Sequence, residues 1–266
     1  MIKIDSSTIG IAGDWHGNTE WALRTLRAFN DRGIKHIFHL GDFGIWGGHD
    51  SAKYILKVNK VLARNSQKLY VTLGNHEDYT RVYAKPFNED GFREYQGENL
   101  LLLSRGARGM IGDRSFISLG GANSIDFQGR REGISWWKEE SITLSDVYKS
   151  AEGGAADLFF AHDAPAGVNI DYSNKADGMG WDANAIRYSE AGRKMLRQAV
   201  DAVKPKVLFH GHHHVYQDTD NLMHDGLEDY TLRAIGLACD GMENSAIIFD
   251  TLSNNYFMIP RMGNNG

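Results

Sequence analysis

Aspartate, asparagine and histidine side chains occur in five short motifs along the chain. The motifs are "GDWHGN" (13–18), "GDFG" (41–44), "GNHE" (74–77), "AHDAP" (161–165) and "GHHH" (211–214). They offer carboxylate oxygen, amide oxygen and imidazole nitrogen but no thiolate, which suits divalent ions such as manganese, iron or zinc. The set is large enough to hold two such ions.

Spacing selects among these side chains. In an extended chain, side chains two positions apart share a face. We therefore expect Asp14 and His16 to point together, and His212 and His214 to do the same. His213 is expected to point elsewhere, in a supporting or surface role. Four further histidines match no motif and are expected to be packed or hydrogen bonded; they are His36, His39, His49 and His224.

Each motif follows a short apolar run, rich in β-branched or aromatic residues, that predicts a buried strand. The runs lie at 7–13, 36–41, 69–74, 157–161 and 206–211. Segments with helical periodicity separate the first three runs, an alternation typical of βαβ units around a sheet. Loops beyond the carboxyl ends of such strands converge on one crevice. The five motifs are therefore expected to meet in space.

The rest of the chain adds antiparallel strands and a long helix. The segment 110–125 predicts strand, turn, strand, and 184–203 predicts a helix. Apolar runs near the end, "YTLRAIGL", "SAIIFD" and "NYFMI", predict three further strands. The chain is therefore an α/β protein with a mixed sheet or two packed sheets. Since no repeat, proline-rich linker or low-complexity block interrupts it, we expect one domain over 1–266.

Composition limits the classes of function. A chain of 266 residues with 42% hydrophobic residues can bury a large core, and a net charge of −5 disfavours generic binding of nucleic acid. The single cysteine, Cys239, excludes an internal disulfide. The start of the chain does not read as a signal peptide, and no apolar run reaches 18 residues. We expect a cytoplasmic protein that does not enter membranes.

The motif order D-x-H, G-D, G-N-H-E, a later histidine and G-H-x-H closely resembles the calcineurin-like metallophosphoesterase family. The motifs extend from Asp14 to His214, about three quarters of the chain. The resemblance implies a four-layer α/β/β/α sandwich, in which two packed mixed sheets are flanked by helices.

The resemblance also implies two sets of metal ligands that share Asp42. It assigns Asp14, His16, Asp42 and His214 to one ion, and Asp42, Asn75, His162 and His212 to the other. His76 of "GNHE" corresponds to the family's catalytic histidine, which acts on the substrate or the leaving group.

Such a centre suits phosphate esters. Two divalent ions bring four positive charges, and Asp14, Asp42 and a bridging hydroxide bring three negative ones, so the site keeps a net charge of about +1. The ions lower the pKa of the bridging water towards about 7, which allows in-line attack of hydroxide on phosphorus without a covalent intermediate. His76 would protonate the departing alkoxide.

Departures from the family pattern favour phosphodiesters. The phosphoprotein phosphatase branch continues its second motif with Asp-Arg, whereas this chain continues "GDFGIWGG" and lacks that arginine. The G-H-x-H ending resembles the branch with cyclic-nucleotide and other phosphodiesterases. We expect a small phosphate ester as substrate, with nucleotides among the candidates. Arg81, Arg130 and Arg131 are candidates for contact with the phosphate.

Other hypotheses remain beside this one. A phosphomonoesterase or protein phosphatase of the same superfamily is the main alternative. A metal-binding, non-catalytic scaffold fits less well because every ligand and His76 are present, and a nuclease would need a basic groove. The polar, glycine-rich segment 163–183, with Trp46 and the pair 136–137, is a candidate lining of the substrate mouth.

Overall fold

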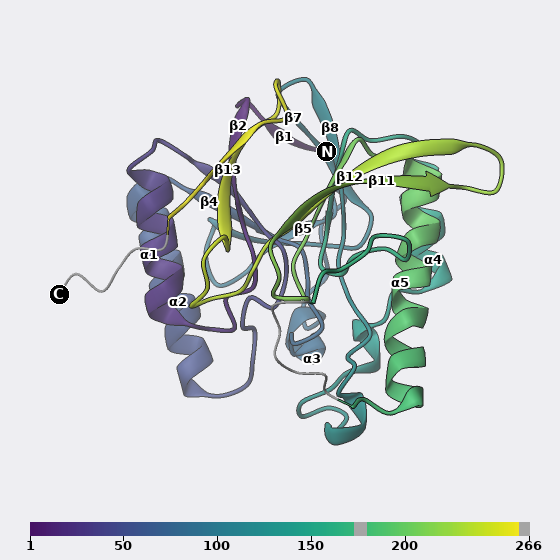
Figure 1. Cartoon of the computed structure of the whole chain (residues 1–266). Helices are drawn as coiled ribbons and strands as arrows, with labels where there is room; N and C mark the ends of the chain where they lie inside the picture. Colours follow the sequence, from purple (N-terminus) through teal and green to yellow (C-terminus); the bar gives the residue numbers. More distant parts are fainter. Residues whose placement is uncertain (173–179, 261–266) are drawn as a thin grey trace.

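Two seven-stranded sheets pack face to face in the computed structural model, which describes residues 1–172 and 180–260 (Figure 1). In spatial order, the first sheet contains β1 (Ile2–Ile4), β7 (Ala107–Ile111), β8 (Arg114–Leu119), β9 (Leu158–Ala161), β10 (Val207–His210), β12 (Asp229–Gly236) and β11 (Gln217–His224). The second contains β14 (Tyr256–Met258), β13 (Ala246–Asp250), β2 (Thr8–Ala12), β3 (His36–His39), β4 (Lys68–Val71), β6 (Leu100–Leu103) and β5 (Phe92–Glu94). We call them the β1–β11 sheet and the β14–β5 sheet.

Helices cover the outer face of each sheet. The helices α1 (Thr19–Asn30) and α2 (His49–Asn65) flank one side of the molecule, and α4 (Leu144–Glu152) and α5 (Ala183–Val203) flank the other (Figure 1). A short helix, α3 (Tyr79–Val82), follows the third motif. Each helix next to a sheet turns an apolar stripe inward, which is why it packs there.

Three clusters of buried side chains hold these layers together. One joins α1 and α2 to the β14–β5 sheet, one joins α4 and α5 to the β1–β11 sheet, and the third lies between the sheets. In the third, the ring of Phe38 on β3 stacks on that of Phe160 on β9, with the ring centroids 4.1 Å apart. The predicted four-layer α/β/β/α sandwich is confirmed.

The strands that precede the motifs run parallel within each sheet. β2, β3 and β4 are parallel neighbours in the β14–β5 sheet, and β9 and β10 are parallel neighbours in the β1–β11 sheet. The five predicted apolar runs coincide with these strands, and the expected antiparallel pair is β7 with β8. Among the described residues, no helix is long and apolar enough to cross a membrane.

Candidate metal centre

The carboxyl ends of five strands, from both sheets, deliver the predicted ligands to one place. Asp14 and His16 follow β2, Asp42 follows β3, Asn75 follows β4, His162 follows β9, and His212 and His214 follow β10. The loops of the two sheets approach so closely that only glycine fits at some positions. A Cβ atom on Gly211 would lie 2.1 Å from Oδ1 of Asp14.

The donor atoms form two groups that share Asp42. One atom each from Asp14, His16 and Asp42 lie within 4.8 Å of one another, and so do one atom each from Asp42, His162 and His212.

The two remaining predicted ligands extend these groups. Nε2 of His214 is 3.2 Å from Oδ2 of Asp14, and Oδ1 of Asn75 is 2.8 Å from Nε2 of His162. The structure thus brings all seven predicted ligands close together, with His214 beside Asp14 and Asn75 beside His162.

The cluster contains two buried carboxylates, whose negative charges a bound cation would neutralise. Asp14 is 0% exposed and Asp42 is 1% exposed. Within the described part of the chain, their ion-pair partners are histidines, with no lysine or arginine among them. Burial opposes ionisation of Asp42, but His162, His76 and His16 hold its pKa well below the usual range. Buried carboxylates are unfavourable unless they are paired or bind a metal. Carboxylates whose partners are histidines form a donor set that fits divalent ions.

Hydrogen bonds set the orientation of two of the histidines. Nδ1 of His162 is 2.6 Å from the carbonyl oxygen of Leu40, to which it donates, so Nε2 faces Asp42 and Asn75. Although burial opposes the charged form, Asp42 raises the pKa of His162 to about 10. A ring fixed in this way can bind a metal through Nε2 when the metal displaces the proton from that nitrogen.

His16 is held in the same way by Asp240, which none of the sequence motifs revealed. Nδ1 of His16 lies 2.8 Å from Oδ1 of Asp240, and Nε2 points towards Asp42 at 3.8 Å. Burial opposes the charge on His16, but the hydrogen bond to Asp240 and the charges of Asp42 and Asp14 raise its pKa to about 9.

The expected extended geometry of the motifs is wrong. His16, Asp42, His212 and His214 have φ values of 44°, 51°, 63° and 53°, in the left-handed region. The chain turns sharply directly after each strand, so the donors converge through tight turns and not through the alternation of a strand. Backbone hydrogen bonds connect these turns to one another. The amide of His16, after β2, donates to the carbonyl oxygen of Asp42, after β3, at 2.8 Å.

His213 points away from the cluster, as expected, but it is not a surface residue. Its side chain is buried, with Nε2 2.9 Å from Oδ1 of Asp163 and Nδ1 2.6 Å from the hydroxyl of Tyr172. The histidines outside the motifs lie elsewhere. His36 bonds to Tyr70, His39 packs on Trp15, His224 pairs with Asp229, and His49 begins α2.

The candidate catalytic histidine, His76, lies at the edge of the cluster. Its backbone amide donates to Oδ1 of Asp42 at 2.8 Å, and its Nε2 is 3.9 Å from Oδ2 of the same carboxylate. Burial lowers the pKa of His76; Asp42 opposes this, and Arg130 adds to the lowering. Trp46 flanks it, since the indole Nε1 donates to the carbonyl oxygen of His76 at 2.6 Å.

The three candidate arginines differ in position. An Nη atom of Arg130 is 2.6 Å from Nε2 of His76. Arg81 pairs with Asp78 and its side chain is 51% exposed. Arg131 is exposed. Arg130 alone of the three contacts a predicted site residue in the described structure.

Two buried carboxylates that were not predicted from the sequence support the site loops. Glu77, the last residue of "GNHE", accepts from the amides of Phe43 at 2.6 Å and Gly74 at 2.9 Å and so joins two motifs. Burial raises its pKa to about 7. The position of Glu77 at the end of the motif "GNHE" was the sequence signal that could have identified it as part of the site.

The second carboxylate, Glu140, orients Asn75, which lies 65 positions earlier in the sequence. It accepts from the hydroxyl of Ser124 at 2.6 Å, and that hydroxyl accepts from Nδ2 of Asn75 at 2.8 Å. The relay turns Oδ1 of Asn75 towards His162. Nothing in the local sequence around Glu140 indicates this role.

The chain's one cysteine also lies beside the cluster. Sγ of Cys239 and one ring nitrogen each of His16 and His214 are all within 4.8 Å of one another. Cys239 follows β12 and precedes Asp240, so it reaches the site on the same loop.

The expected lining of the substrate mouth is only partly visible. Residues 173–179 of the segment 163–183 lie outside the described residues. Trp137 is buried and donates from Nε1 to Thr80 at 3.1 Å, which identifies it as a packing residue. Trp46, 37% exposed, is the indole that stands beside His76.

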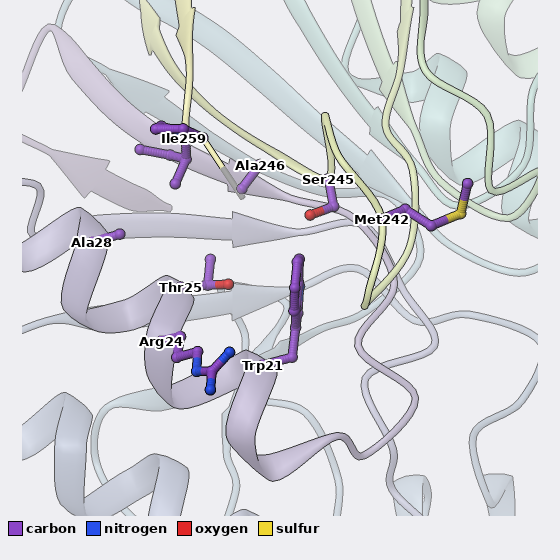
Figure 2. A pocket seen from close by; sticks show the side chains of 9 residues that line it. Trp21, Arg24, Thr25, Ala28, Met242, Ser245, Ala246 and Ile259 are labelled. Atoms are coloured by element: carbon purple, nitrogen blue, oxygen red, sulfur yellow. The ribbon is translucent and has the colours of Figure 1, made fainter. Parts of the chain in front are cut away.

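A separate hollow lies beside α1, away from the donor cluster (Figure 2). Trp21, Arg24 and Thr25 of α1 face Ser245, Ala246 and Ile259 across it (Figure 2). Its lining is largely apolar and contains none of the predicted ligands, so it offers no comparable chemistry.

Two packed mixed sheets, with carboxylates and imidazoles gathered at the ends of their parallel strands, define an α/β sandwich with a candidate dinuclear centre. A family model described as calcineurin-like phosphoesterase matches residues 7–216. The chain belongs to the calcineurin-like phosphoesterase family.

Comparison with solved structures finds similar chains at low sequence identity. A dimetal phosphatase from Danio rerio is 12% identical, with 91% of each chain covered and a TM-score of 0.50. TT1561 of Thermus thermophilus is 10% identical, with 95% of this chain and 98% of that chain covered and a TM-score of 0.49. No curated protein matches the chain.

Proposed function

We propose that this protein hydrolyses phosphate esters with two divalent metal ions. The observation that carries the proposal is the pair of donor groups that share the buried Asp42. The first ion would be held by Asp14, His16, Asp42 and His214, and the second by Asp42, Asn75, His162 and His212. Manganese, iron and zinc all suit these oxygen and nitrogen donors.

In the proposed reaction, the side chains of the protein would hold the two ions and position His76 beside them. When bound, the ions would act as Lewis acids on the phosphoryl oxygens and lower the pKa of a water molecule, so that hydroxide attacks phosphorus directly. Asp42 belongs to both donor groups and would contribute to both ion sites. His76, whose Nε2 is 3.9 Å from Oδ2 of Asp42, would protonate the leaving oxygen.

Two classes of ester are candidates for the substrate. Phosphodiesters are favoured because the segment "GDFGIWGG", which contains Asp42, carries no arginine that could bind the second negative charge of a phosphomonoester. Phosphomonoesters are the second candidate, because Arg130 brings a guanidinium to His76 from another loop. Nucleotides are included in both classes.

Hydrolysis of two chromogenic esters tests the proposal. The protein is stripped with a chelator, reloaded with Mn²⁺, Fe²⁺ or Zn²⁺, and assayed with bis(4-nitrophenyl) phosphate, 4-nitrophenyl phosphate and 2′,3′-cyclic nucleotides. We expect activity that depends on added metal and is lost in Asp42→Asn, with Asp220→Asn, an exposed residue of β11, as the control.

Two results would contradict the proposal. Bound metal with no hydrolysis of any ester would instead favour a scaffold. In ¹⁸O-labelled water, label that entered a phosphorylated protein, and not the product alone, would exclude direct attack.

A further inference from the structure

Arg130 reaches the candidate site from a loop that contributes none of the predicted metal ligands. It follows the short 3₁₀ helix Phe127–Gly129, and its side chain is only 11% exposed. One Nη atom lies 2.6 Å from Nε2 of His76. The guanidinium therefore contacts the candidate catalytic histidine, whose Nε2 is 3.9 Å from Oδ2 of Asp42.

The side chain is fixed before any substrate binds. Nε of Arg130 donates to Oδ2 of Asp126 at 2.9 Å, and an Nη atom is 2.8 Å from the same oxygen. Another Nη atom donates to the carbonyl oxygen of Ser135 at 3.4 Å. Because the guanidinium is already oriented, a ligand that binds it has little side-chain entropy to overcome.

The Nη atom that contacts His76 also lies 2.8 Å from Oδ2 of Asp126, so this atom has one carboxylate partner and one weaker partner, the imidazole. A guanidinium has only N–H donors, so Nε2 of His76 must accept this hydrogen bond. A neutral imidazole nitrogen is a poorer acceptor for a cation than a phosphate oxygen, which forms a shorter, charge-assisted bond. A phosphate placed at the metal cluster would therefore compete with His76 for Arg130.

We propose that Arg130 is a specificity-determining residue that binds a non-bridging phosphoryl oxygen of the substrate and releases Nε2 of His76 in doing so. The inference rests on the proposed phosphoesterase function. A phosphomonoester carries up to two negative charges and a phosphodiester carries one, so Arg130 favours the monoester. Arg130 would then supply the charge that the segment "GDFGIWGG" lacks, which shifts the expected preference from the phosphodiester favoured above to the phosphomonoester.

The test compares Arg130→Ala with Arg131→Ala in the Mn²⁺-loaded protein. Arg131 is the adjacent, exposed arginine and controls for the loss of one positive charge. Values of kcat and KM are measured with 4-nitrophenyl phosphate and bis(4-nitrophenyl) phosphate. For Arg130→Ala we expect kcat/KM to fall about 100-fold with the monoester and about 10-fold or less with the diester, since a hydrogen bond to a charged group is lost. Arg131→Ala should stay within about twofold of the wild type.

Rescue separates a direct contact from a structural effect. Free guanidinium ion at millimolar concentration is expected to restore part of the monoester activity of Arg130→Ala without activating the wild type. Metal content and the thermal unfolding midpoint of the variant are measured alongside. An equal loss with both esters, or no rescue in a folded, metal-loaded variant, overturns the proposal.

Calorimetric titration with inorganic phosphate keeps this inference separate from the proposed function. Arg130→Ala is expected to bind orthophosphate at least tenfold more weakly than the wild type, whether or not any ester is hydrolysed. If the wild type cleaves esters but both proteins bind phosphate equally, Arg130 has no such role and the phosphoesterase function stands. If phosphate binding falls but the wild type cleaves no ester, the phosphate contact stands and the proposed function fails.

Discussion

Replacing Asp240 with asparagine is expected to weaken metal binding at the His16 group without unfolding the protein. Oδ1 of Asp240 lies 2.8 Å from Nδ1 of His16, and Oδ2 accepts from Nδ2 of Asn18 at 2.8 Å. Both oxygens of the carboxylate are therefore in use. The substitution keeps the shape of the side chain but changes one acceptor into a donor.

The surrounding bonds prevent an easy adjustment. The Oδ1 atom of Asn18 caps α1 by accepting from the amide of Trp21, so the Asn18 amide cannot turn over without losing that cap. The new amide group must therefore face either the donor of Asn18 or the ring of His16. Changes to such partners of metal-binding histidines typically weaken metal affinity by about 10- to 100-fold, or about 1.4 to 2.7 kcal/mol.

Calorimetric titration of the metal-free protein with Mn²⁺ measures this loss. Asp220→Asn, the same chemical change at an exposed position, is the control and should bind as the wild type does. We expect one of two binding steps to weaken in Asp240→Asn while the other changes little, because the predicted ligand that the Asp240 carboxylate is hydrogen bonded to in the described structure, His16, belongs to one group. Equal affinities for the variant and the wild type would refute the role given to Asp240.

Two further substitutions test the packing of the loops and of the sheet. Gly211→Ala places a Cβ atom 2.1 Å from Oδ1 of Asp14, so that carboxylate must move; we expect metal content to fall and hydrolysis to drop about 100-fold. Asp157→Asn should lower the free energy of unfolding by about 1 kcal/mol at pH 7, after allowance for solvent screening of this partly exposed group. Burial opposes ionisation of Asp157, but hydrogen bonds from Lys206 and Ser115 hold its pKa at about 2, so its contribution is present above about pH 4 and is lost as the pH falls through 2. Urea unfolding at pH 7, 4 and 3 should show that the difference in the free energy of unfolding between the wild type and Asp157→Asn becomes smaller as the pH falls.

Matched controls exist for both substitutions. A Cβ atom on Gly180 would meet none of the described residues within 4 Å, so Gly180→Ala should keep the metal content of the wild type. Asp113→Asn, in an exposed turn, should leave the unfolding curve unchanged at every pH. A normal metal content in Gly211→Ala, or a loss in Asp157→Asn that does not depend on pH, would contradict the respective argument.

The parallel strands and their polar ends could be predicted from the sequence because each signal is local. An apolar run followed directly by Asp, Asn or His needs no knowledge of distant residues, and β2, β3, β4, β9 and β10 were found this way. The edge strand β11 was not predicted, because "QDTDNLMH" is mostly exposed and lacks the apolar alternation that marks a strand. Its eight residues form a strand only through pairing with β12.

The supporting residues could not be predicted because their partners are remote. Asp240 acts on His16 across 224 positions of sequence, and Glu140 acts on Asn75 through Ser124. A lone carboxylate in a loop has no spacing that reveals its partner. Arg130 was one of three equal candidates in the sequence, and only the fold separates it from Arg81 and Arg131.

The backbone of the ligand loops explains why spacing alone misjudged the local geometry. His16, Asp42, His212 and His214 all adopt the left-handed region, which disfavours residues with a Cβ by about 1 to 2 kcal/mol each. Glycine would relieve this strain but would remove the donor atom. The strain persists because bonds between loops fix the turns: the carbonyl oxygen of Asp42 accepts from His16, and the amide of His212 donates to Asp14. The residues that provide the candidate ligands therefore adopt a backbone conformation that is locally unfavourable. The rule that side chains two positions apart share a face applies to regular strands and fails at these turns.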